Sequence, residues 1–133
     1  MNVQLSENEQ IRIVLETLYR SFRQKNHEGM ISVMASDVWI RFLGQSDFRG
    51  KELASEFFKQ SNDLLEDLDF RITDTIIEAP YAAIIWTETA RTKKGDPWEN
   101  SGVDVYKIEN NKILFLHENN DTTVHHRHFP PEK

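Results

Sequence analysis

Two carboxylic acids in the second half of the chain, Asp104 and Glu118, are the residues whose type and spacing point most directly to chemistry. Each falls in a segment that is predicted to be a strand, and the two strands follow each other along the chain. Diagonal positions on neighbouring strands lie about 7 to 8 Å apart, close enough for two carboxyl groups to change one another's ionisation. Apolar surroundings would raise both pKa values, and a nearby arginine would lower one. The pair would then offer the proton donor and the proton acceptor that acid/base catalysis requires.

Residues that favour turns divide the second half of the chain into extended segments. The predicted strands are 70–78, 82–93, 98–108 and 112–121. The breaks between them fall at Ala79-Pro80, at Gly95-Asp96 and at 109–111. This succession predicts a four-stranded antiparallel meander.

The turn at Gly95-Asp96 determines which side chains share a face with Asp104. If it is a two-residue turn, the paired positions are Arg91 with Asn100, Thr89 with Gly102, and Thr87 with Asp104. These side chains then lie on one face of the sheet.

The following turn decides which half of the last strand joins that face, because a slip of one residue turns every side chain to the other side. A three-residue turn over 109–111 brings in Leu116, Glu118 and Asn120. A two-residue turn at Asn110-Asn111 brings in His117, Asn119 and Asp121 instead, with His117 and Asp121 as an alternative acid/base couple. Hydrophobicity does not choose between them, since 113–116 are apolar on both faces.

The first half of the chain is predicted to be mainly helical. Its elements are a helix over 7–25, a short helix that Asn26 caps, a strand over 38–43 and a third helix after Gly50. Ser6 and Glu9 have the spacing of a capping box at the first helix. The apolar stripe of the second helix is expected to reach Met34.

Composition restricts the function classes. The chain has 133 residues, a formal net charge of −6 and no cysteine. This length predicts one domain, and an acidic chain without segregated Lys and Arg is a poor partner for nucleic acid. The absence of cysteine excludes disulfides and thiolate chemistry. Because the sequence shows neither an export signal nor an apolar run of about 18 residues, we expect a soluble, cytoplasmic protein that does not bind membranes.

Helices grouped first and long antiparallel strands grouped last predict an α+β fold, in which a curved sheet wraps around the helices. We expect one domain over 1–121 and a loose C-terminal tail over 122–133. The tail contains His125, His126 and His128, but their spacing matches no metal motif. Neither a metal nor another cofactor is predicted.

The order of these elements, together with three short segments, resembles the nuclear transport factor 2-like superfamily, which includes SnoaL-like proteins. The segments are Phe48-Arg49-Gly50-Lys51, Gly102-Val103-Asp104-Val105-Tyr106 and Asn111-Lys112-Ile113, and the resemblance covers about 10–121. It implies a cone-shaped α+β fold, with a curved antiparallel sheet around three N-terminal helices and a deep apolar pocket inside. It also implies a homodimer that packs through the outer face of the sheet.

The resemblance extends to individual residues. Asp104 matches the acid of ketosteroid isomerase that stays protonated and donates a hydrogen bond to the developing oxyanion, whereas the base and the tyrosine of that enzyme fall at Phe42 and Leu18. Glu118 takes the place of the carboxylate base of SnoaL-like cyclases and limonene epoxide hydrolase, but the other catalytic residues of the hydrolase are not reproduced. This alignment favours the three-residue turn, which puts both acids on the inner face.

We therefore predict Glu118 as the base and Asp104 as the proton donor of a cofactor-free isomerase, cyclase or hydrolase that acts on a small apolar or amphipathic ligand. The residues expected to contact the substrate are Phe42, Phe57, Thr87, Thr89, Arg91, Trp98, Asn100, Tyr106, Leu116 and Asn120. By the same parity, Trp39 and Trp86 are assigned to outer or dimer packing, and Tyr19 to the core. A non-catalytic ligand-binding or dimeric interaction module is the alternative.

Overall fold

The structure, a computed structural model, describes residues 5–42 and 47–129. Its first two helices are each started by a side chain that accepts a hydrogen bond from a backbone N–H of the first turn. Helix α1 spans Glu7–Arg23 and is capped by the Ser6 hydroxyl at 3.1 Å. Helix α2 spans His27–Ser32 and is capped by the Asn26 side chain at 3.0 Å. Both predicted helix starts are confirmed, because these caps satisfy amides that the first turn leaves unpaired.

The chain becomes a strand directly after α2. Strand β1 spans Met34–Phe42, so the prediction that Met34 continues the helical stripe is wrong. Met34 is fully buried and pairs with Ile113 on strand β6. Pairing inside the sheet outweighs the local helical pattern here. The predicted end of this strand, Leu43, lies outside the described residues.

A short strand and the third helix follow. Strand β2, Phe48–Arg49, pairs with β1, and helix α3 spans Lys51–Leu64. Gly50 between them has a φ of 101°, a conformation that favours glycine. Among the helices of the described residues, none is both long enough and apolar enough to cross a membrane.

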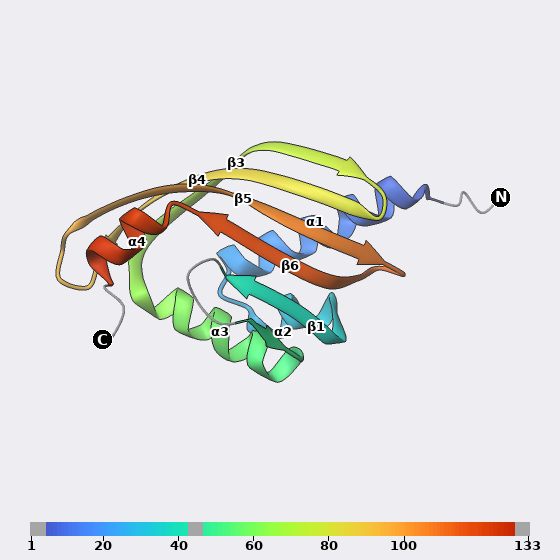
Figure 1. Cartoon of the computed structure of the whole chain (residues 1–133), viewed down its shortest axis with the longest axis horizontal. Coiled ribbons are helices and arrows are strands. Elements are labelled where there is room, and N and C mark those ends of the chain that lie inside the picture. Colours follow the sequence, from blue (N-terminus) through green and yellow to red (C-terminus); the bar gives the residue numbers. More distant parts are fainter. Residues whose placement is uncertain (1–4, 43–46, 130–133) are drawn as a thin grey trace.

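Four long strands form most of the sheet. They are β3 Leu65–Glu78, β4 Tyr81–Thr92, β5 Pro97–Glu109 and β6 Lys112–Asn120. The strand order is β2-β1-β6-β5-β4-β3, with β1 parallel to β6 and all other neighbours antiparallel. The long strands curve around α1 (Figure 1), which confirms the predicted α+β fold.

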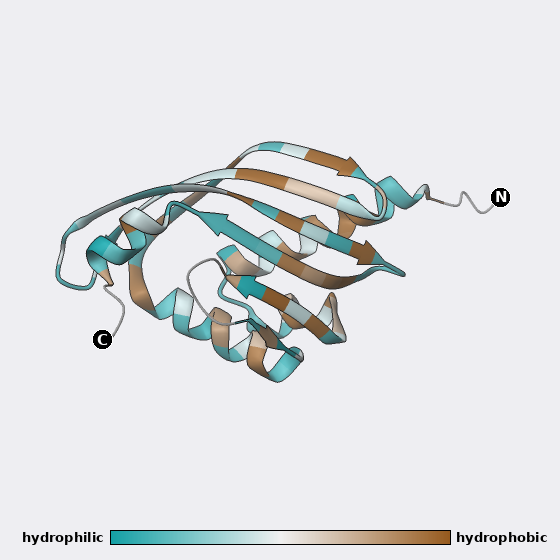
Figure 2. Cartoon of the chain, in the orientation of Figure 1, coloured by the Kyte–Doolittle hydropathy of each residue, from teal (hydrophilic) through white to brown (hydrophobic). Residues whose placement is uncertain are grey.

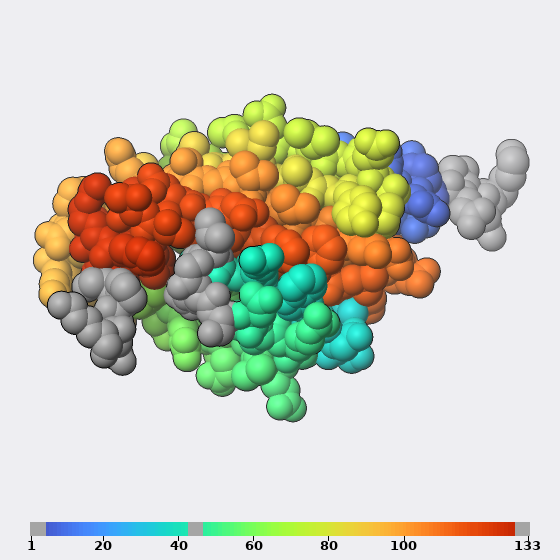
Figure 3. Space-filling view, viewed as in Figure 1, coloured from blue at the N-terminus to red at the C-terminus, as the bar shows by residue number. Residues whose placement is uncertain are grey.

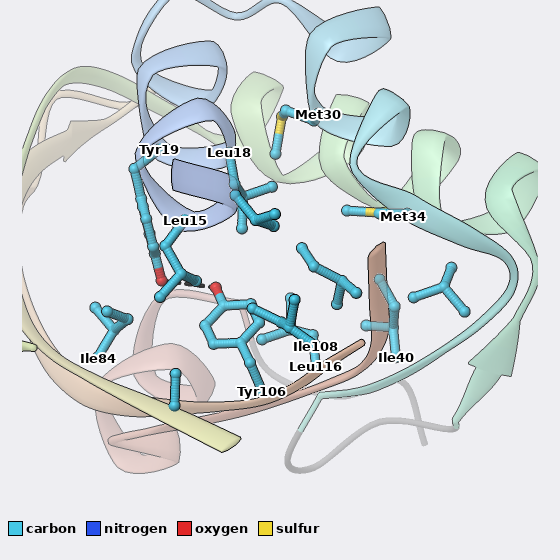
Figure 4. Packing of buried hydrophobic residues seen from close by; sticks show 14 of the residues in the cluster. Leu15, Leu18, Tyr19, Met30, Met34, Ile40, Ile84, Tyr106, Ile108 and Leu116 are labelled. Atoms are coloured by element: carbon cyan, nitrogen blue, oxygen red, sulfur yellow. Dashed lines mark hydrogen bonds between the residues drawn. The ribbon is translucent and has the colours of Figure 1, made fainter. Parts of the chain in front are cut away.

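The core lies between α1 and the concave face of the sheet. The side chains of Leu15, Leu18 and Tyr19 on α1 point toward Ile84, Tyr106 and Leu116 on the strands (Figure 4). Buried residues alternate with more exposed ones along β4 and β5, and the β4–β5 turn is mostly hydrophilic (Figure 2). The sheet therefore presents an apolar inner face at its centre.

The register between β4 and β5 differs from the predicted one. Asp104 pairs with Ile84 rather than Thr87, and Arg91 pairs with Pro97 rather than Asn100. The turn is not Gly95-Asp96 alone: the backbone N–H of Thr92 donates to the carbonyl of Asp96, and Gly95 at φ 91° closes a three-residue loop over 93–95. Every side chain of β4 is therefore on the opposite face from the one predicted.

The β5–β6 connection combines features of both alternatives. Asn110 and Asn111 form a two-residue turn, with φ angles of 52° and 61°. A β-bulge at Leu114 then shifts the register by one residue, so that Asp104 pairs with Glu118. The predicted three-residue turn is wrong. The bulge nevertheless places the same side chains of β6 on the inner face as that turn would have done.

The predicted loose tail contains a helix. Helix α4 spans Thr122–His128, and the Asp121 side chain accepts from the Thr123 N–H at 3.0 Å. His125 on this helix and Phe129 directly after it contact the Trp98 ring, with ring centroids 6.1 Å and 5.7 Å away. The helix lies at the same end of the molecule as the β4–β5 turn (Figures 1 and 3). A cap and an aromatic contact outside the helix give this short segment a structure that its own sequence does not indicate.

Candidate functional site

A cavity of about 110 Å³ opens between the concave face of the sheet and helices α1, α3 and α4. Most of its wall is apolar and aromatic. The polar side chains in the wall are those of Tyr19, Ser61, Glu88, Asn100, Asp104, Tyr106, Glu118, Asn120 and His125. Such a cavity, apolar with a few convergent polar groups, is typical of small-molecule sites.

Asp104 lies deep in this cavity and is 5% exposed. Its Oδ1 accepts a hydrogen bond from the Trp86 indole N–H at 2.9 Å, and its Oδ2 accepts one from the Tyr19 hydroxyl at 2.9 Å. Burial raises the pKa of Asp104 to about 7 although both hydrogen bonds act in the opposite direction, and the charge of Glu88 raises it further. Asp104 therefore changes its protonation near neutral pH.

Tyr19 and Tyr106 extend this network across the cavity. Their hydroxyl oxygens are 2.7 Å apart (Figure 4). Because the Tyr19 proton is donated to Asp104, Tyr106 is the donor in the bond to Tyr19. Burial raises the pKa of both phenols well above the ordinary value, so both remain protonated donors.

Glu118 projects from β6 into the same cavity and pairs across the strands with Asp104. No described residue donates a hydrogen bond to its carboxyl group. Burial raises the pKa of Glu118 well above its ordinary value, and the charges of Asp104 and Glu88 act in the same direction. Because Asp104 has two donors to its carboxylate and Glu118 has none among the described residues, Asp104 ionises more readily than Glu118.

The cavity contains a third acid that the sequence analysis did not single out. Glu88 lies half-buried on β4 and accepts a hydrogen bond from the Trp98 indole N–H at 3.2 Å. Burial raises its pKa, and the bond from Trp98 opposes that rise. The three-residue loop of the β4–β5 hairpin brings Glu88 to the inner face.

The structure separates the predicted contact residues into two groups. Those found in the cavity wall are Phe42, Phe57, Trp98, Asn100, Tyr106, Leu116 and Asn120. Thr87, Thr89 and Arg91 are exposed on the other face of β4, and Arg91 forms an ion pair with Asp67. Their predicted place in the pocket is wrong because it followed from the two-residue turn. The roles proposed for the wall residues stay predictions.

The assignment of Trp86 to outer packing is also wrong, since Trp86 is 2% exposed and its indole N–H donates a hydrogen bond to Asp104. A side chain at Gly102, which pairs with Trp86, would overlap the indole ring and the Asn119 carbonyl. Gly102 is therefore a sequence feature that could have indicated a large side chain packed against this position. Tyr19 belongs to the core as assigned and also donates to Asp104.

His117 lies on the outer face of β6, outside the cavity. Its ring is stacked at 4.4 Å on Phe115 and meets Trp39 edge-on at 4.6 Å. The alternative couple of His117 and Asp121 is therefore not assembled in the cavity. Within 5–42 and 47–129, no group of three or more His, Asp or Glu residues could hold a metal ion.

Solved structures share this architecture at low sequence identity. A nuclear transport factor 2-like protein of unknown function from Burkholderia pseudomallei has a TM-score of 0.81 at 16% identity, covering 92% of this chain and 97% of its own. A candidate isomerase from Bacillus subtilis has a TM-score of 0.83 at 13% identity, covering 94% and 96%. An epoxide hydrolase of the limonene epoxide hydrolase-like type from Mycobacterium tuberculosis has a TM-score of 0.77 at 10% identity, covering 92% and 91%. At these identities the likeness shows the fold alone.

Sequence comparison identifies the family. No curated protein matches the chain. The family model of the SnoaL-like domain matches residues 15–115, which include α1 from Leu15 onward and the sheet as far as Phe115 on β6. The chain belongs to the SnoaL-like domain family, and its fold is similar to that of nuclear transport factor 2-like proteins.

Proposed function

We propose that the protein is a cofactor-free acid/base enzyme of the isomerase, cyclase or hydrolase type, acting on a small, mostly apolar or amphipathic ligand in the cavity. The observation that carries the proposal is the direct cross-strand pairing of Asp104 with Glu118 inside an apolar wall. Burial and the charge of each acid on the other oppose the ionisation of both, so one of the two stays protonated near neutral pH. Two structural neighbours, a candidate isomerase and an epoxide hydrolase, support this class of chemistry.

The hydrogen bonds favour a division of roles opposite to the one predicted from the sequence. Asp104 accepts from Trp86 and Tyr19, which stabilise its anion, whereas no described residue stabilises the anion of Glu118. We assign the role of proton donor to Glu118, which stays protonated and delivers its proton to the substrate, and the role of proton acceptor to Asp104. A base with a pKa of about 7 is well matched to neutral pH.

The test combines titration with turnover. Carboxyl ¹³C NMR should show Asp104 titrating near pH 7, and Glu118 titrating well above the ordinary range of a glutamate. On a panel of small ketones and epoxides, Asp104→Asn and Glu118→Gln should each lower turnover by roughly 10²- to 10⁴-fold. Glu99→Gln, which changes an exposed acid on the same strand as Asp104, should not. Ordinary pKa values for both cavity acids would contradict the proposal.

A non-catalytic ligand-binding module is the second candidate, and one observation favours it. Phe42, which stands where ketosteroid isomerase has its base, is packed against Phe57 with ring centroids 5.3 Å apart. In this case ligands would bind, but no member of the panel would be converted. Substitution of Asp104 or Glu118 would then change affinity alone.

The proposal includes a homodimer and a cytoplasmic location. Support for the dimer comes from the outer face of the sheet, where Val103 is 37% exposed and Tyr81 is 49% exposed. Phe115 and His117 lie on the same face. Apolar side chains exposed together on the face of a sheet are typical of an interface.

A further inference from the structure

Glu88 does not belong to the acid/base pair of Asp104 and Glu118. The groups around its carboxyl do not compensate a negative charge on it. Its carboxyl group can accept about four hydrogen bonds, but it receives one, from the Trp98 indole, at 3.2 Å. Asp104, on the next strand, receives two bonds at 2.9 Å. Removing a carboxylate from water is costly unless partners replace the water.

The wall of the cavity supplies no cation to pair with Glu88. It contains neither lysine nor arginine, and its one histidine, His125, is kept neutral because burial lowers its pKa. The rings of Phe42, Phe57 and Trp98 are part of the same wall. Their faces carry partial negative charge, which attracts cations and repels anions. The cavity is therefore electrostatically suited to a positive group.

We propose that the ligand of this cavity carries a basic nitrogen and that Glu88 binds it as an ammonium ion, while the apolar part of the ligand fills the aromatic end of the cavity. This inference rests on the proposed function, which makes the cavity the substrate site. It assigns the third acid to substrate recognition and leaves Asp104 and Glu118 for proton transfer.

Basic residues near the cavity do not oppose this assignment. Lys93, Lys94 and Arg127 line a separate surface depression, which shares Leu64 and Phe129 with the cavity. All three are exposed to solvent, so salt and water screen their charges. The acids in the cavity wall, Glu88, Asp104 and Glu118, therefore determine the charge inside the cavity.

The test uses three probes of nearly equal shape and different charge: benzylamine, benzyl alcohol and benzoate. Isothermal titration calorimetry of the full chain at pH 7 should show benzylamine binding about tenfold more tightly than benzyl alcohol, since only the ammonium adds an attraction between opposite charges to the hydrogen bond that either probe can donate to Glu88. Benzoate should not bind measurably. Glu88→Gln should bring the affinity for benzylamine down to that for benzyl alcohol, and should lower the affinity for benzyl alcohol much less.

Two variants locate the contact. Glu99→Gln removes the same charge from the exposed face of β5 and should leave the tenfold preference intact. Loss of the preference in Glu118→Gln but not in Glu88→Gln would overturn the assignment to Glu88. Equal affinities for benzylamine and benzyl alcohol would overturn the inference alone, whereas binding of none of the probes would overturn the proposed substrate site as well.

Discussion

At Asp104, burial and hydrogen bonding act in opposite directions on one carboxyl group. Burial raises its pKa, whereas the Trp86 and Tyr19 donors lower it, and the result is a value of about 7. Each donor should therefore be measurable through the titration of this one residue.

Tyr19→Phe should raise the pKa of Asp104 further, by about one unit. The change removes a donor to the carboxylate, and a hydrogen bond to a charged group contributes about 1.5 kcal/mol, close to the free energy of one pKa unit. Carboxyl ¹³C NMR measures the shift. Tyr81→Phe, at an exposed position on β4, is the control. An unchanged Asp104 titration in Tyr19→Phe would show that the hydroxyl does not stabilise the anion.

Asp104 should also make the stability of the protein depend on pH. Its pKa is 3.8 in ordinary surroundings and about 7 in the folded state, so between these values the folded state binds more protons than the unfolded state. The contribution of Asp104 is fully present below about pH 4 and is lost as the pH rises through 7. It amounts to up to about 4 kcal/mol.

Urea unfolding at pH 4, 5.5 and 7 tests this sign. The wild type should lose stability across this series as Asp104 loses its proton, whereas Asp104→Asn has no such proton to lose. The free energy of unfolding of the variant minus that of the wild type should therefore increase from pH 4 to pH 7. Asp63→Asn, at an exposed position on α3, should show no such trend. A relative stability that falls or stays level would mean that the buried carboxyl is not protonated preferentially in the folded state.

The sequence predicted that Asp104 and Glu118 lie on the inner face of the sheet, but not which side chains donate to Asp104. The spacing of Tyr19 with Leu15 and Leu18 indicates the core face of a helix, which is correct. A helical pattern cannot indicate that a phenol at this position meets an acid 85 residues later in the chain. That contact depends on how α1 lies across the sheet.

At the scale of elements, the sequence predicted where most of the helices and strands lie, but the face that each strand presents depended on its turns. Helix starts followed from local capping, and the extended segments followed from β-branched and aromatic residues. The face of each strand depended on loop length, and one extra residue in the β4–β5 loop placed Glu88 rather than Arg91 toward the cavity. The bulge at Leu114 has no sequence signal, because the segment around it is apolar on both faces.

Helix α4 depends on its cap and on contacts outside itself. At seven residues it is too short to be stable alone. Asp121→Ala should cost about 1 kcal/mol and increase hydrogen exchange of the α4 amides, because the Thr123 N–H loses its acceptor. Ser6→Ala removes the corresponding cap of α1 and should leave α4 exchange unchanged. Equal protection of α4 in Asp121→Ala and the wild type would show that contacts with Trp98 suffice.

At the scale of the whole molecule, the two faces of the sheet have different surroundings. The inner face is filled by α1 and the cavity, whereas the outer face of the central strands carries Val103, Phe115 and His117. His117 has a buried Nε2 with no partner among the described residues. A second copy of the chain on this face would cover the apolar side chains and could supply an acceptor or donor to that nitrogen.

A homodimer through the outer face predicts a mass of about 31 kDa in sedimentation equilibrium, twice the 15.7 kDa of one chain. Val103→Lys should shift the mass toward the monomer, because an unpaired charge at the core of an interface must lose its water without gaining a partner. Leu53→Lys makes the same change at an apolar residue on α3 that is 53% exposed, and it should leave the dimer intact. Near-native ligand binding by a monomeric Val103→Lys would further show that each cavity is complete within one chain. A wild-type protein that sediments as a monomer, or a Val103→Lys variant that remains a dimer, would exclude this face as the interface.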